Sequence, residues 1–145
     1  MNCPTCRPLT PDGPYREASP AHRAGTSLLR EKHPSGIEVD RCPSCYGLWL
    51  DPGEMERAET VARKRGRSID RENVIADLFR RTYENARHRA EPRILDCPAC
   101  DEVMFEREWT YGSQVRVDVC MACRGVWLDA GELDDLARFL GATWE

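Results

Sequence analysis

Four Cys-x-x-Cys pairs constrain this 145-residue chain more than any other feature of its sequence. The chain holds eight cysteines, and all eight fall in these pairs. Two cysteines separated by two residues can direct both sulfurs to one metal ion through a tight turn, and two such turns complete a tetrahedron. Hydrophobic residues make up 41% and charged residues 32% of the chain, so its apolar core is modest. Such a chain depends on disulfides or metal ions for its stability, and we expect metal.

The cysteine pairs belong to an internal repeat. Residues 37–56 align with residues 115–134 at an offset of 78, and ten of the 20 aligned positions are identical. Each copy also has an earlier pair, Cys3–Cys6 and Cys97–Cys100. The two pairs are separated by 35 residues in the first copy and by 19 in the second, and four prolines within residues 8–20 mark the extra residues as a loop. We therefore predict a duplicated unit, with an insertion in the first copy and a spacer between the copies.

Each copy is predicted to form a β-hairpin followed by a short helix. Apolar residues alternate with polar ones on both sides of a Tyr111–Ser113 turn, and residues 26–41 repeat this pattern around a His33–Gly36 turn. After each second pair, Asp51 and Asp129 are suitable N-caps for a helix. Glutamate stands three residues after each, as in a capping box.

The spacer is predicted to be an amphipathic helix running from Asp70 to about Ala90. Its apolar residues fall on one side, and most of its arginines fall elsewhere. The predicted fold class is thus a small metal-stabilised α+β protein, in which this spacer joins two four-cysteine zinc ribbons. The expected segments are residues 1–65 for the first ribbon, 66–93 for the basic spacer and 94–145 for the second ribbon.

The repeat assigns four cysteines to each of two metal sites. Site one comprises Cys3, Cys6, Cys42 and Cys45, and site two comprises Cys97, Cys100, Cys120 and Cys123. Gly47 and Gly125 follow the second pairs, where we expect glycine to let the backbone bend so that its amides point at the sulfurs. Four thiolates suit Zn²⁺ and leave no position for water or substrate, so the two zinc ions are expected to be structural. The ligands alone leave open an iron-loaded, rubredoxin-like electron-transfer site. A redox dithiol would need a βαβ context, which the sequence lacks.

The chain resembles the bacterial zinc-finger family named for its likeness to the zinc ribbon of transcription factor IIB. The resemblance lies in Cys-Pro-x-Cys, a hairpin, and then Val-Asp-x-Cys-x-x-Cys-x-Gly-x-Trp-Leu-Asp-x-Gly-Glu, over Cys3–Met55 and again over Cys97–Leu133. Met121 stands where the family has proline and Met55 where it has leucine, but all eight cysteines are present. The resemblance implies zinc-ribbon folds and a link to transcription.

Charge and hydropathy exclude some classes of protein. No apolar run approaches the roughly 18–20 residues of a membrane-spanning helix. The N-terminus shows no secretory signal, so we expect a cytoplasmic protein with reduced thiols. The formal net charge is −4, with −2 in residues 1–56, +5 in residues 57–93 and −7 in residues 94–145. Two tetrathiolate zinc sites would lower the total to about −8, which argues against general coating of DNA.

These features predict a non-enzymatic zinc-binding recognition protein. Its target is expected to be a protein, and the transcription machinery is one candidate. Direct nucleic-acid binding by the basic spacer is the alternative, and dimerisation through the spacer's apolar stripe also stays open. Trp49 and Trp127 are expected to pack between a metal turn and the adjoining helix, rather than to stack on bases. The candidate contacts for nucleic acid or a partner are Arg63, Lys64, Arg65, Arg67, Arg80, Arg81, Arg87 and Arg89.

Overall fold

A computed structural model describes residues 1–6, 26–66, 76 and 94–144. Its elements in the first repeat are β1 (Leu29–Lys32), β2 (Glu38–Arg41), β3 (Leu48–Leu50) and α1 (Glu54–Arg65), and those in the second are β4 (Met104–Glu108), β5 (Arg116–Cys120), β6 (Val126–Leu128) and α3 (Glu132–Phe139). Strand β1 pairs antiparallel with β2, and β4 pairs antiparallel with β5. The predicted spacer helix lies outside the described residues. Within the described part of the chain, neither helix has the length and hydrophobicity required to cross a bilayer.

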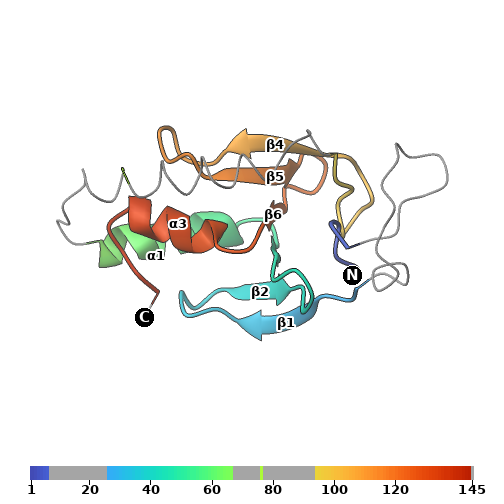
Figure 1. Cartoon of the computed structure of the whole chain (residues 1–145), viewed down its shortest axis with the longest axis horizontal. Coiled ribbons are helices and arrows are strands. Elements are labelled where there is room, and N and C mark those ends of the chain that lie inside the picture. Colours follow the sequence, from blue (N-terminus) through green and yellow to red (C-terminus); the bar gives the residue numbers. More distant parts are fainter. Residues whose placement is uncertain (7–25, 67–75, 77–93, 145) are drawn as a thin grey trace.

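A third strand in each repeat joins the two copies into one antiparallel sheet, with strand order β1-β2-β3-β6-β5-β4. At its centre β3 pairs with β6, and Trp49 lies directly opposite Trp127. Leu48 faces Leu128, the equivalent of Leu50, and Leu50 faces Val126, the equivalent of Leu48. This exchange around the tryptophan pair shows that the repeats are related by an approximate two-fold axis through it. Figure 1 shows hairpins β1–β2 and β4–β5 on opposite sides of the molecule, with α1 and α3 between them.

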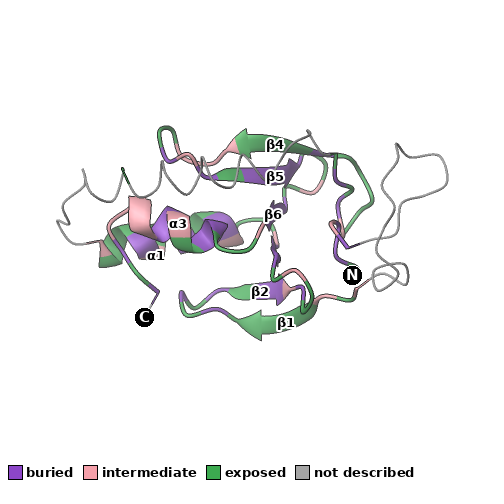
Figure 2. Ribbon diagram, in the orientation of Figure 1, coloured by how far each residue is buried: buried purple, intermediate pink, exposed green. Residues whose placement is uncertain are grey.

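Alternation along the central strands creates two separate cores. Leu48, Leu50 and the flanking valines of β2 and β5 pack with the inner faces of α1 and α3. Trp49 and Trp127 point to the other face, where they pack with buried cysteines of both metal sites. Figure 2 shows the resulting pattern, with the central strands buried and the edge strands β1 and β4 largely exposed.

A side chain of each hairpin also contacts the other repeat, at helix α1 in one case and at the segment after helix α3 in the other. In the second hairpin, the Trp109 indole Nε1 donates a hydrogen bond to Glu59 on α1 at 3.0 Å. In the first hairpin, the His33 ring meets the Trp144 ring edge to face, with 5.2 Å between their centroids. The two repeats therefore stabilise one another through both the sheet and the helices.

The helices begin two residues later than predicted. Their N-caps are Gly53 and Gly131, both in the left-handed region at φ 88° and 87°, and neither makes a side-chain capping bond. The prediction that Asp51 and Asp129 are the N-caps is therefore wrong. One part of the predicted capping box is present, because the Glu132 carboxylate accepts a hydrogen bond from the Asp129 backbone N–H at 2.8 Å.

The end of α3 agrees with the sequence. Gly141 has a φ of 77° and follows the last turn. Its N–H donates to the carbonyl of Arg138 at 2.9 Å, and the N–H of Ala142 donates to that of Ala137 at 2.8 Å. This pattern of two bonds around a left-handed glycine is a Schellman motif.

Candidate metal centres

The cysteine turns close through the same two backbone hydrogen bonds wherever the structure describes them fully. In the turn that begins at Cys42, its N–H donates to the carbonyl of Gly47 and its carbonyl accepts from the N–H of Tyr46, both at 2.9 Å. The turns beginning at Cys97 and Cys120 repeat both bonds at 2.7–3.0 Å. Each turn is therefore a closed loop that fixes the direction of both of its cysteine side chains.

The bend in these turns falls on the residue after the second cysteine, and that residue is not glycine. Tyr46, Asp101 and Arg124 have φ values of 60°, 64° and 65°, in the left-handed region that few non-glycine residues adopt. The prediction that Gly47 and Gly125 supply the bend is therefore wrong, since neither has a positive φ.

Gly47 and Gly125 instead make room for tryptophan side chains of the opposite repeat. A Cβ placed on Gly47 would lie 2.2 Å from Cζ2 of Trp127, and one placed on Gly125 would lie 2.1 Å from Cζ2 of Trp49. Both tryptophans are fully buried. Each therefore packs against a metal turn, as predicted, but against the turn of the other repeat and away from the helices. Their burial rules out stacking on nucleic-acid bases.

The eight cysteine sulfurs form two groups of four. Within each group, all Sγ atoms lie within 4.8 Å of one another. In site one, Cys3 and Cys45 are 3.6 Å apart and Cys6 and Cys42 are 3.9 Å apart. In site two, the corresponding distances are 3.6 Å for Cys97–Cys123 and 3.4 Å for Cys100–Cys120.

These distances fit a tetrahedral metal ion. A tetrahedron with metal–sulfur bonds of about 2.3 Å has edges of about 3.8 Å, close to the spacings in both sites. A disulfide needs sulfurs about 2.05 Å apart, and all eight cysteines are free. The residues present therefore fit one tetrathiolate metal ion in each site, as the sequence predicted.

Backbone amides and burial tune the thiols. The N–H groups of Ser44 and Cys45 point at the Cys42 sulfur at 3.4 and 3.5 Å, and such contacts stabilise a thiolate. Without metal, the hydrogen bond with Cys3 lowers the pKa of Cys45 to about 4 and raises the pKa of Cys3. Burial raises the pKa of Cys6 to about 11. Metal binding must therefore remove the protons of Cys3 and Cys6, whereas Cys45 ionises readily before the metal binds.

Site two likewise contains a cysteine with a lowered pKa and a cysteine with a raised pKa. Burial opposes the ionisation of Cys120, but the backbone N–H of Cys123 and the side chain of Cys100 outweigh it and lower the pKa of Cys120 to about 7. Burial raises the pKa of Cys97.

Arg30, which the sequence did not single out, binds two aspartates of the first repeat. The Arg30 guanidinium donates to both carboxylate oxygens of Asp40 at 3.1 and 2.9 Å, and to Asp51 at 3.0 Å. Asp51 also accepts a hydrogen bond from the Trp49 indole at 3.2 Å. The signal for this residue was its place in the predicted hairpin, because Arg30 lies directly opposite Asp40 in the β1–β2 register.

The structure describes three of the eight predicted basic contact residues. Arg63, Lys64 and Arg65 form the last turn of α1 and are exposed. Arg63 pairs with Glu59 one turn earlier at 2.6 Å, and Arg65 donates to the carbonyl of Pro34 at 3.3 Å. The other five predicted contacts, Arg67, Arg80, Arg81, Arg87 and Arg89, lie outside the described residues.

Comparison with known families gives one match. A family model described as "Transcription factor zinc-finger" matches residues 25–60 and 96–138, which together make up more than half of the chain. The second segment includes all four cysteines of site two, whereas the first begins after Cys3 and Cys6. The structure shows that these two cysteines nevertheless complete site one. Searches among curated proteins and among solved structures find no match.

Proposed function

Because this chain belongs to the transcription factor zinc-finger family and carries two structural Zn²⁺ ions, we propose that it is a non-enzymatic recognition protein that binds a protein partner. The observation that carries the proposal is that each group of four thiolates fills a tetrahedral coordination shell. A metal ion held in this way has no position for water or substrate, so it shapes a surface rather than activating a reactant.

The surface that zinc shapes includes exposed apolar side chains. Tyr46 and Met121 lie on the second cysteine turn of each site and are 59% and 69% exposed. Closed turns hold their backbones in place, so binding through them costs little backbone conformational entropy. We infer that these two turns contact the partner.

The transcription machinery is the target class that the family suggests. The charge of the second repeat favours a protein over nucleic acid, because residues 94–145 carry −7 before the charge of the thiolates is counted. The eight free cysteines suit a reducing compartment, and we place the protein in the cytoplasm.

Binding to purified RNA polymerase tests this proposal directly. We expect the zinc-loaded chain to bind in a nuclease-treated, DNA-free mixture, and Tyr46→Ala or Met121→Ser to weaken binding at least about tenfold. Tyr111→Ala is the matched control, since Tyr111 is 98% exposed on the distant β4–β5 turn. If the polymerase does not bind, the target class is wrong. The same comparison can be made with proteins captured from a nuclease-treated extract. If all of them bind the Tyr46→Ala and Tyr111→Ala variants equally well, the proposed surface is wrong.

Direct nucleic-acid binding is the second candidate, favoured by one specific feature. Residues 57–93 hold 11 basic and six acidic side chains, and Lys64 is exposed at the end of α1. This function requires binding that weakens steeply with salt and that falls when Arg80 and Arg81 are replaced by alanine. Absence of binding at low salt would eliminate it.

A further inference from the structure

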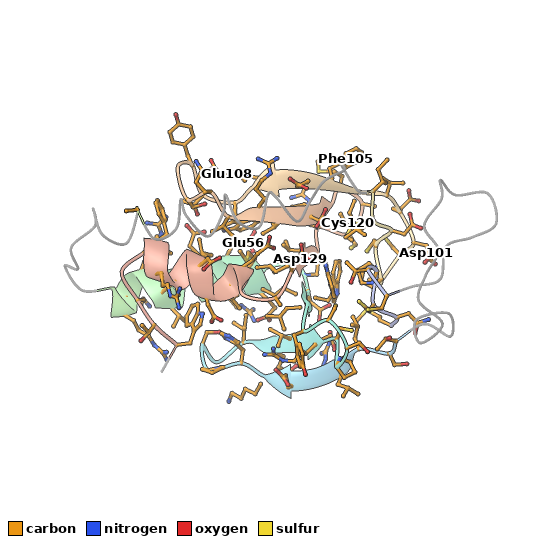
Figure 3. The ribbon with its side chains drawn as sticks, in the orientation of Figure 1. Glu56, Asp101, Phe105, Glu108, Cys120 and Asp129 are labelled. Carbon is orange, nitrogen blue, oxygen red and sulfur yellow. The ribbon has the colours of Figure 1, made fainter. Side chains whose placement is uncertain are left out.

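The two metal sites have the same ligands but different surroundings. In the first cysteine turn Pro4 is buried, and Cys6 is only 3% exposed. In the corresponding turn of site two, Pro98 is partly exposed and Cys100 is exposed. Asp101, which follows Cys100, lies at the surface at the end of the molecule away from the helices (Figure 3). One ligand of site two is therefore accessible from solvent, whereas its counterpart in site one is not.

A hydroxyl group supports site one and is missing from site two. Thr5 Oγ1 lies 3.1 Å from the Cys3 sulfur and 3.3 Å from the Cys45 sulfur. A metal-bound thiolate carries no proton, so the hydroxyl must be the donor, and the two sulfurs share its single proton. It thereby links the first and second cysteine turns. Ala99 occupies the same position between Cys97 and Cys100; its backbone N–H lies 3.4 Å from the Cys97 sulfur, but its side chain has no hydroxyl to donate.

We propose that the two zinc ions are held unequally, with site one retained through the Thr5 hydroxyl and site two exchangeable through the exposed Cys100 ligand. Zinc leaves a tetrathiolate site by ligand exchange. As a bond forms between zinc and an incoming nitrogen, oxygen or sulfur donor, one zinc–sulfur bond breaks and the released thiolate takes a proton from solvent. Cys100 offers this route, while the burial of Cys6 closes it in site one.

Loss of zinc from site two would alter the packing at the centre of the sheet. The turn Cys120–Gly125 closes over the Trp49 ring of the first repeat. When zinc no longer draws Cys120 and Cys123 together, this turn loses its constraint and Trp49 loses part of its packing. The occupancy of site two therefore controls the junction of the two repeats.

Zinc transfer from the full-length, zinc-loaded protein to the chromogenic chelator 4-(2-pyridylazo)resorcinol tests the proposal. We expect two phases of one zinc ion each, separated by at least about tenfold in rate, the usual scale of effects from groups that support metal ligands. Thr5→Val removes the hydroxyl but preserves the side-chain shape, and it should accelerate the slow phase alone by about tenfold. Thr5→Ser keeps the hydroxyl and should restore the slow phase.

A reciprocal variant in site two tests the proposal even if the protein does not fold with a substitution at Thr5. Ala99→Thr places a hydroxyl in site two and should slow the fast phase while leaving the slow phase unchanged. Treatment of the zinc-loaded protein with limiting iodoacetamide, followed by peptide mapping, should find Cys100 alkylated before Cys6. A single phase that releases both ions, alkylation of Cys6 first, or equal rates in the wild-type, Thr5→Val and Ala99→Thr proteins would each overturn the proposal.

Discussion

Trp49 and Trp127 lie opposite each other in the central strand pair, and each indole occupies the space in front of a glycine of the other's repeat. This reciprocal packing therefore links the zinc turns to the pairing of the central strands, which joins the two repeats into one sheet. Neither repeat can bury its tryptophan in this way alone, because the receiving glycine belongs to the other copy.

The first prediction concerns Gly47. Gly47→Ala should lower the free energy of unfolding by at least about 2 kcal/mol, because the added Cβ meets the Trp127 ring and forces the Gly47 turn away from it. The measurement is urea unfolding of the zinc-loaded protein. Trp127→Leu in the same chain should recover part of the loss, since a smaller side chain gives the methyl group room.

Gly36→Ala is the control for that experiment. Gly36 has a φ of 92° but open space around its Cβ position, so alanine there should cost only about 1 kcal/mol of backbone strain. Equal losses at Gly36 and Gly47 would contradict the packing role of Gly47.

The second prediction concerns metal removal. Chelation of both zinc ions should abolish cooperative thermal unfolding and expose the two tryptophans, because the cysteines and the indoles share one core. Circular dichroism should show the loss of secondary structure, and tryptophan emission should shift to longer wavelength. Metal analysis of the purified protein should find two zinc ions per chain. A metal-free chain with an unchanged cooperative transition would refute this dependence.

The third prediction concerns the Arg30–Asp40 pair. Arg30→Gln should lower the free energy of unfolding by about 1–2 kcal/mol, because it leaves the buried Asp40 carboxylate without its two hydrogen bonds from the guanidinium. The figure is below that of a fully buried pair because half of the Arg30 side chain is exposed to water. Adding Asp40→Asn should recover much of the loss, and a double-mutant cycle by urea unfolding measures this coupling. Additive losses would show that the two side chains act independently.

The fourth prediction concerns acid pH and His33. Burial lowers the pKa of His33 below its ordinary value of 6.5, and its Nδ1 already accepts a hydrogen bond from the Ser35 N–H at 3.1 Å. As the pH falls through 6.5, the unfolded chain therefore takes up a proton that the folded chain refuses, and the free energy of unfolding decreases.

His33→Asn isolates this effect, since asparagine can still accept the Ser35 bond but does not titrate. Urea unfolding of zinc-loaded protein at several pH values between about 7.5 and 5.5 should show a smaller decrease for the variant than for the wild type. Protonation of the zinc ligands contributes to both proteins and cancels in the comparison. Identical pH profiles would exclude a contribution from His33.

Sequence reasoning succeeded where the controlling interactions are local. The alternation in residues 103–119 predicted β4 and β5, and Gly141 correctly marked the end of α3, because both signals act within a few residues. The helix starts were misplaced by two residues. There Gly53 and Gly131 adopt left-handed conformations and leave Asp51 to bind Arg30 and Trp49, partners that local capping rules do not consider.

The third strand of each repeat was not predicted. Leu48–Leu50 is three apolar residues long, too short for a periodic signal, and it becomes a central strand only because Val126–Leu128 lies beside it. Cross-strand pairing between residues 78 positions apart depends on the complete fold, so no local pattern can reveal it.

The sequence by itself determined which eight cysteines bind metal and where the hairpins turn, because spacing and turn chemistry act over short distances. The internal repeat also determined how the cysteines divide into two sites. Only the tertiary structure decided that the two units share one sheet, that each tryptophan packs on the other unit's glycine, and that the two zinc sites differ in exposure. These properties depend on which surfaces meet across the approximate two-fold axis. The surfaces that meet are those whose contact buries the apolar strands β3 and β6 at the same time.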